Sequence, residues 1–192
     1  MVQTMVRTGR LGTLVVKVLL ERNDVNPNTA NKNGMTPLSR AAWKGHEGVV
    51  KMLLARLDVD PNTADEYRQT PLFGAAHEGH EGVVKVLLEQ NNINPNTANK
   101  DGTTPLFAAA WKGHEEVVKT LLQRADVNPD MADLAGETAL SQALKHGHHA
   151  IVKLLSEHKN PIPLSGCHES ATLSSPEPAD IDPRPSKKIL RL

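Results

Sequence analysis

The sequence predicts an all-α solenoid built from tandem copies of a short helix pair. Three groups of residues recur in register at intervals of 34 residues. Thr-Pro-Leu begins at Thr36, Thr70 and Thr104, with Thr-Ala-Leu at Thr138. Gly-His begins at Gly45, Gly79, Gly113 and Gly147. A β-branched residue followed two positions later by proline recurs at Val25, Val59, Ile93 and Val127. Three groups that keep one period through four copies identify a repeat array.

The first half of each copy has the signature of a short helix. Thr36 is a good N-cap, and Pro37 suits the first helical position, where its missing N–H costs nothing. Leu38 and Ala41 lie one turn apart and give the helix a narrow apolar stripe. Gly45 suits the end of the helix, where a left-handed backbone is needed. These features predict a helix over residues 37–44.

The second half predicts another helix and then a long loop. Val50 and Leu53 belong to the apolar stripe of a helix from about residue 47 to 56. Residues 58–69 are rich in Asn, Asp and Pro, which predicts a loop. In the equivalent loop of the preceding copy, the Asn-Gly pair ending at Gly34 predicts a tight turn with positive φ. A helix pair this short cannot bury its own apolar faces, so about three or more copies must stack to be stable.

The repeated pattern TPLxxAAxxGHExVVKxLL, followed by DVNPN and an Asn/Asp-x-x-Gly turn, resembles the ankyrin repeat over about residues 15–156. Tetratricopeptide repeats have a similar period but are nearly all helix, and the proline-bearing loops exclude them. The proline-containing form is similar to the repeats of fungal ankyrin arrays, which are often joined to NACHT-type domains. The resemblance implies an ankyrin-type solenoid of helix-turn-helix repeats joined by β-turn loops, with no enzymatic activity and no cofactor.

Some positions depart from the family pattern. Arg68 stands where the other copies have a glycine, which predicts a reshaped turn. Leu57 and Ala125 replace the glycine that usually ends the second helix, and we expect strain there or a shifted helix end. Phe73 and Phe107 replace a histidine of the family pattern and are predicted to be packing residues.

The repeats predict the organisation of the whole chain. We expect a degenerate N-terminal capping repeat, four ankyrin repeats and a tail that is rich in proline and serine and therefore disordered. The predicted boundaries are 1–30 for the capping repeat, 31–64, 65–98, 99–132 and 133–159 for the four repeats, and 160–192 for the tail.

Composition excludes several classes of protein. Lys plus Arg and Asp plus Glu both total 22, so the sequence lacks the basic excess of a nucleic-acid-binding protein. No apolar run approaches the ~18 residues of a membrane span. Cys167 is the single cysteine, so no internal disulfide forms. We expect a cytoplasmic monomer without metal or cofactor, with the nucleus as the alternative location.

The candidate binding residues are those that differ between otherwise constant copies. In ankyrin proteins the matching positions, at the turn tips and at the end of the first helix, face a concave groove that contacts partners. The predicted partner-binding residues are Met35, Trp43, Lys44, Tyr67, Gln69, His77, Glu78, Trp111, Lys112 and Lys145. Trp43 and Trp111 occupy one position two copies apart, which places them ~20 Å apart on one surface with His77 between them. Tryptophan is favoured at interface hot spots, although each ring is equally suited to packing over its own helix junction.

Three functions are compared on these features. The favoured one is a non-enzymatic scaffold or adaptor that binds a protein partner. The alternative is a fragment, or a regulatory or spacer arm, of a larger multidomain ankyrin protein. The third is a metal-binding or enzymatic protein, which would depend on the histidines at His77 and His80 or at His146, His148 and His149. The spacing of His77 and His80 does not match a zinc motif, and the later three are expected to be solvated surface residues.

Overall fold

The computed structural model describes residues 17–18 and 25–159. Contacts divide the chain into two units, Met1–Pro161 and Ile162–Leu192, and every described residue belongs to the first unit. The predicted tail and most of the predicted capping repeat therefore lie outside the described residues. Within the described ranges the secondary structure is helical and contains no strand, which confirms the all-α class.

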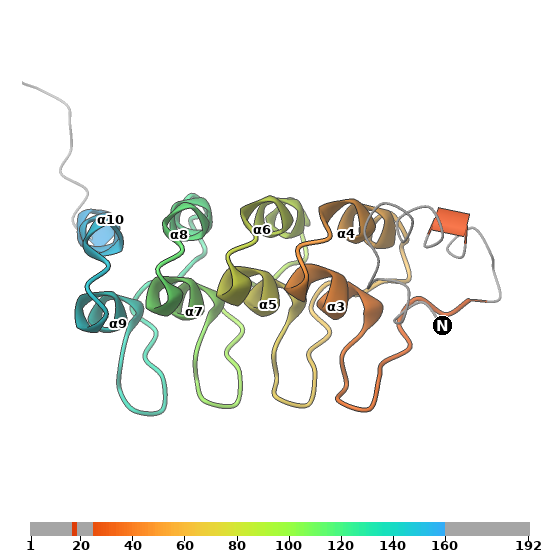
Figure 1. Ribbon diagram of the computed structural model, residues 1–192, viewed down its shortest axis with the longest axis horizontal. Helices are drawn as coiled ribbons and strands as arrows, with labels where there is room; N and C mark the ends of the chain where they lie inside the picture. The colour runs from red at the N-terminus through yellow and green to blue at the C-terminus, as the bar shows by residue number, and fades with distance from the viewer. Residues whose placement is uncertain (1–16, 19–24, 160–192) are drawn as a thin grey trace, which may run out of the picture. The chain divides into compact units, whose positions relative to one another are not determined.

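The described helices form four pairs that stack in two layers (Figure 1). In chain order they are α3 (Pro37–Trp43), α4 (Glu47–Leu54), α5 (Pro71–Glu78), α6 (Glu81–Leu88), α7 (Pro105–Lys112), α8 (Glu115–Leu122), α9 (Ala139–Lys145) and α10 (His149–Lys159). The first helices of the pairs lie side by side in one layer, and the second helices lie in the other. Long turns, here called fingers, project from the first layer away from the second (Figure 1).

Each first helix begins at a threonine cap. The Thr36 side chain accepts a hydrogen bond from the Ser39 backbone N–H over 3.1 Å, and Pro37 follows at the first helical position. The same bond recurs at 3.2 Å from Phe73 to Thr70. Because the cap satisfies one of the N–H groups that have no partner within the helix, seven or eight residues suffice for a defined helix.

Small residues let the first helices pack closely. Leu38 is 2% exposed and Leu72 is fully buried, and each such leucine stabilises the array by about 1.5–3 kcal/mol. Beside them, Ala42 and Ala76 have no exposed surface because the next repeat lies directly on them. At the equivalent position of the last described repeat, Leu144 is 59% exposed. The alanines are therefore the contact between one repeat and the next.

In three of the described repeats a histidine closes the first helix of the repeat before it. The Nε2 atoms of His80, His114 and His148 lie 3.1, 3.0 and 3.1 Å from the carbonyl oxygens of Trp43, His77 and Trp111. A carbonyl oxygen only accepts, so each Nε2 carries the proton and donates it. This corrects the expectation that His148 is a solvated surface residue, because its ring links two repeats.

The glycines of the first three Gly-His pairs make room for that ring. A Cβ atom on Gly79 would lie 2.6 Å from Nδ1 of His114, and one on Gly45 would lie 2.7 Å from Nδ1 of His80. Gly79 also has φ +78°, as predicted from its place at the helix end. Glycine is thus required for two reasons, the left-handed backbone and the close approach of the next repeat's imidazole.

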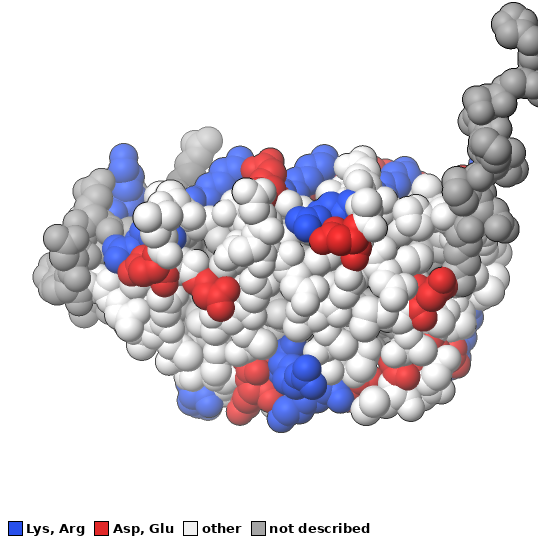
Figure 2. Space-filling view, turned by 180° about the vertical axis from the view of Figure 1, so that it is seen from behind, with Lys and Arg blue, Asp and Glu red and all other residues white. Residues whose placement is uncertain are grey.

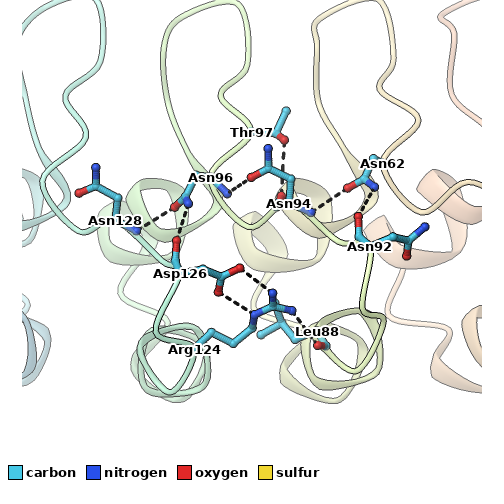
Figure 3. A network of polar contacts seen from close by, with 9 residues as sticks. All are labelled: Asn62, Leu88, Asn92, Asn94, Asn96, Thr97, Arg124, Asp126 and Asn128. Atoms are coloured by element: carbon cyan, nitrogen blue, oxygen red, sulfur yellow. Dashed lines mark hydrogen bonds and ion pairs between the residues drawn. The ribbon is translucent and has the colours of Figure 1, made fainter.

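Asparagines join the loops that follow the second helices (Figure 3). The Asn62 amide donates to the Asn92 carbonyl over 2.7 Å and accepts from the Asn94 backbone N–H over 2.9 Å. Asn96 makes the same two bonds to the next loop, at 2.6 and 2.8 Å. An amide side chain both donates and accepts, which explains why asparagine recurs at this position.

Next to these asparagines, an arginine that follows α8 bonds to the end of α6. Arg124 donates from Nη1 to the Leu88 carbonyl over 3.0 Å, and from Nε and Nη2 to the Asp126 carboxylate over 2.9 and 2.6 Å (Figure 3). Hydrogen bonding to this guanidinium lowers the pKa of Asp126 below its ordinary value. The ion pair therefore stabilises the fold above the ordinary carboxyl pKa, and this contribution disappears as the pH falls through the lowered value.

The finger at Arg68 keeps the conformation of its neighbours. Arg68 has φ 61°, close to the 75° of Gly34, and it is the only described non-glycine residue with positive φ. Its N–H donates to the Asp65 carbonyl over 2.9 Å, as Gly34 does to Asn31. The prediction of a reshaped turn is therefore wrong. The turn is retained although a side chain in this region costs about 1–2 kcal/mol.

The second helices end earlier than the sequence indicated. Helix α4 ends at Leu54, and its cap Ala55 keeps a right-handed helical backbone. Leu57 and Ala125 therefore need no left-handed conformation, and neither has positive φ. The shift of the helix end, one of the two outcomes expected there, removes the strain.

Gly79→Ala and Gly147→Ala test the contact between histidine and glycine. Both glycines have positive φ at the same place in the repeat, but nothing lies within 4 Å of a Cβ on Gly147. We expect Gly147→Ala to lower the free energy of unfolding by about 1–2 kcal/mol through backbone strain alone. Gly79→Ala should cost about 1–3 kcal/mol more, because the methyl group displaces His114 and breaks its hydrogen bond.

Urea unfolding followed by circular dichroism measures both losses. A double-mutant cycle adds a check, since Gly79→Ala should cost less when His114 is already alanine. Equal losses for the two glycine variants would contradict the proposed contact.

Asn96→Asp tests the asparagine bonds. The substitution removes the amide donor and places a carboxylate beside the Asp126 carbonyl, so we expect a loss of about 1–3 kcal/mol in the free energy of unfolding. Asn128→Asp is the matched control, because the Asn128 side chain only accepts a bond from a backbone N–H and Asp60 does the same in an earlier repeat. Thermal or urea unfolding that gives equal losses for the two variants would show that the amide donor is unimportant.

Candidate partner-binding groove

The predicted binding residues gather between the fingers and the first helices. A first hollow of about 260 Å³ is lined by Met35, Trp43, Lys44, Tyr67 and Gln69. A second hollow of about 560 Å³ is lined by Gln69, His77, Trp111 and Lys145. Because Gln69 borders both hollows, they adjoin, and together they are called the groove below. The remaining two candidates lie beside it: Glu78 contacts His77 over 2.8 Å, and the Lys112 ammonium lies 4.2 Å from the centre of the Trp111 ring.

Aromatic rings from successive first helices form a continuous row. The ring of His77 stacks on Trp43 with centroids 5.2 Å apart, and it lies 6.0 Å from the ring of Trp111. The Trp111 ring then meets His146 edge-on at 6.4 Å. These four residues are called the ring row. The two indoles are thus much closer together than the ~20 Å expected from helix spacing, because both lean toward His77.

The hydrogen bonds between repeats hold the backbone of the ring row. The carbonyl groups of Trp43, His77 and Trp111 accept the bonds from the histidines of the following repeats. Each of these residues therefore has its main chain fixed by the next repeat while its side chain faces the groove. This arrangement positions the rings on rigid helix ends, which suits a site that binds without reorganising.

The two tryptophans differ in their surroundings. A Cβ on Gly74 would lie 2.9 Å from Cε3 of Trp43, so the Trp43 ring rests on the Gly74 backbone. Gln142 stands at the equivalent place after Trp111, and Trp111 is 38% exposed. Trp43 is therefore mainly a packing residue that borders the groove, whereas Trp111 is the more exposed of the two.

The finger wall of the second hollow is held by side-chain acceptors. Asn99 accepts from the Asp101 and Thr103 backbone N–H groups over 2.9 and 3.0 Å. Asp133 does the same in the next finger, at 2.9 Å for both bonds. Neighbouring fingers are also joined through their backbones, for example from the Leu134 N–H to the Asp101 carbonyl over 3.0 Å. The fingers are therefore joined to one another as well as held internally.

The phenylalanines form the floor between the two walls. Phe73 is 3% exposed and Phe107 is 5% exposed, which confirms that both are packing residues. Phe73 also stacks against His77 with ring centroids 6.1 Å apart. The floor of the second hollow is thus apolar and supports the ring row from below.

The histidines do not assemble a metal site in the described part of the chain. No group of three His, Cys, Asp or Glu side chains lies close enough there to hold an ion. His146 and His148 stack with centroids 6.1 Å apart, but Nε2 of His148 already donates to Trp111. Among the described helices, none combines the length and apolarity that crossing a bilayer requires.

Two residues that shape the groove were missed from the sequence. Gly74 supports Trp43, and His114 fixes the backbone of His77. The signal for Gly74 is its position, which is occupied by Arg40, Gly74, Ala108 and Gln142 in successive copies. A glycine among larger residues indicates that something lies against it.

Comparison with known proteins identifies the repeats. Models of ankyrin repeats match residues 19–75, 55–131 and 112–155, the second as three copies and the other two as many copies. A search of curated proteins gives no match. The matched ranges together cover the described helix pairs up to residue 155, within α10. The chain therefore belongs to the ankyrin repeat family, whose repeats generally serve as non-enzymatic protein–protein interaction modules.

Proposed function

We propose that this protein is an adaptor that binds a protein partner in the groove between its fingers and first helices. The observation that carries the proposal is Trp111, a residue that is 38% exposed, lines a hollow of about 560 Å³ and has the Lys112 ammonium over its ring. A partly exposed tryptophan above an apolar floor is the kind of anchor on which interface energy concentrates.

The rigidity of the groove supports the same proposal. The helix ends are closed by histidines of the next repeat, and the finger tips are closed by Asn99 and Asp133. A partner that enters the groove orders few side chains of the array, so little of its binding free energy is lost to conformational entropy. The shape of the groove walls and the chemistry of their side chains therefore determine which partner binds.

Trp111→Ala tests the groove assignment. Random peptides displayed on phage are selected against the wild-type array, and the enriched peptides are then titrated by fluorescence anisotropy against variants. We expect Trp111→Ala to weaken binding by about tenfold or more, as removal of a hot-spot residue does. Circular dichroism should show unchanged helix content, since the indole is partly exposed.

Leu57→Ala is the control for this experiment. Leu57 is an exposed apolar side chain that lines neither hollow of the groove. If the enriched peptides lose affinity for Leu57→Ala and keep it for Trp111→Ala, the groove assignment is wrong.

A further inference from the structure

Lysines on the second helices form ion pairs with glutamates of the same helix. Lys51 pairs with Glu47 over 2.7 Å, and Lys85 pairs in the same way with Glu81 one turn earlier. Figure 2 shows basic and acidic side chains next to one another along the second-helix edge. Exposed pairs of this kind contribute little to stability, but they leave no large field of one sign on that side.

Lysines at the ends of the first helices differ. In the described part of the chain, no carboxylate lies within ion-pair distance of Lys44, Lys112 or Lys145. The one carboxylate in this series of positions, Glu78, accepts from Nδ1 of His77 over 2.8 Å. The helix-end side of the groove therefore carries positive charge that the fold does not neutralise.

The favourable position of a cation at a helix C-terminus is not sufficient to explain the unpaired lysines. A cation near a helix C-terminus is favourable by about 0.3–1 kcal/mol, and all three lysines benefit from that position. The benefit leaves the ammonium groups free, however, and Lys112 is also held over the face of Trp111 at 4.2 Å. Cations beside an exposed ring form a surface that accepts a carboxylate and an apolar group together.

The finger wall of the second hollow carries negative charge opposite the positive charge at the helix ends. Asp101 and Asp133 line the finger side of the second hollow, and Lys145 lines the helix-end side. An acidic group in the groove is therefore drawn to the helix ends and repelled from the fingers.

The spacing of the repeats suits an extended chain. Packed helices are ~8–10 Å apart. A peptide in the extended polyproline II conformation advances ~3.1 Å per residue with three residues per turn, so every third side chain lies on the same face and meets a new repeat. Carboxylates at that spacing would face Lys112 and Lys145 from adjacent repeats while the residues between them contact Trp111.

We propose that the groove binds an acidic, extended segment of its protein partner, with carboxylates at the helix-end lysines and an apolar side chain on Trp111. The inference rests on the proposed function, since it names the chemistry of the partner for the same groove. The acidic character of the segment, and not only its apolar contact, then determines which partner binds.

The test uses two short labelled peptides and the full chain. One peptide has Glu at every third position with Leu and Ser between, and the other has Lys in place of each Glu. Trp43 and Trp111 are the only tryptophans, so their fluorescence reports binding at the groove. We expect the Glu peptide to bind about tenfold or more tightly than the Lys peptide, and its affinity to fall with added salt.

Charge reversal locates the contact. Lys112→Glu with Lys145→Glu should weaken binding of the Glu peptide by about tenfold or more. Lys85→Glu with Lys153→Glu makes the same change of charge on the second helices and should leave binding nearly unchanged. If both charge reversals weaken binding equally, the attraction is not local and the inference is overturned.

Two further outcomes separate this inference from the proposed function. If the Glu and Lys peptides bind equally and both depend on Trp111, the groove binds peptides but the acidic preference is wrong. If neither peptide binds while the phage-selected peptides do, the acidic preference is again wrong and the groove assignment stands. If neither the selected peptides nor the Glu peptide loses affinity when Trp111 is replaced by alanine, both proposals are overturned.

Discussion

The array depends on contact between a histidine ring and the backbone of a glycine in the preceding repeat. His114 lies directly on Gly79 and donates to the carbonyl group at the end of α5. Helices α3, α5 and α7 are therefore started by a threonine of their own repeat and completed by a histidine of the next. The bond couples each of these helices to its neighbour, as expected of a repeat array.

This coupling connects the packing of the array to its binding surface. The residues whose carbonyl groups receive the histidine bonds are Trp43, His77 and Trp111, and their side chains form the ring row. The same position of the repeat thus carries a structural bond on its main chain and a variable side chain toward the groove. Side chains can differ from repeat to repeat without loss of the bond, because the bond uses only backbone oxygen.

Local features of the fold were predictable from the sequence, and contacts between repeats were less so. Thr36 and Gly45 signal a helix start and a left-handed end within a few residues of chain. Variation among equal repeats also predicted residues that line the groove or lie beside it, and their binding of a partner stays a prediction. The bond from His114 to His77 joins residues of different repeats and follows only from how helices stack. The turn at Arg68 keeps its form against the local backbone preference, because backbone bonds from Glu66 to Asn33 and from Lys100 to Tyr67 hold this finger between its neighbours.

The second hollow is lined by residues of three successive repeats, from Gln69 and His77 through Trp111 to Lys145. Coupling within the array extends only to nearest neighbours, so thermal opening starts locally and spreads one unit at a time. A bound segment that contacts all three repeats couples their opening, because opening any one of them also breaks contacts with the segment. Occupancy would then convert a chain of separately melting units into one longer cooperative block.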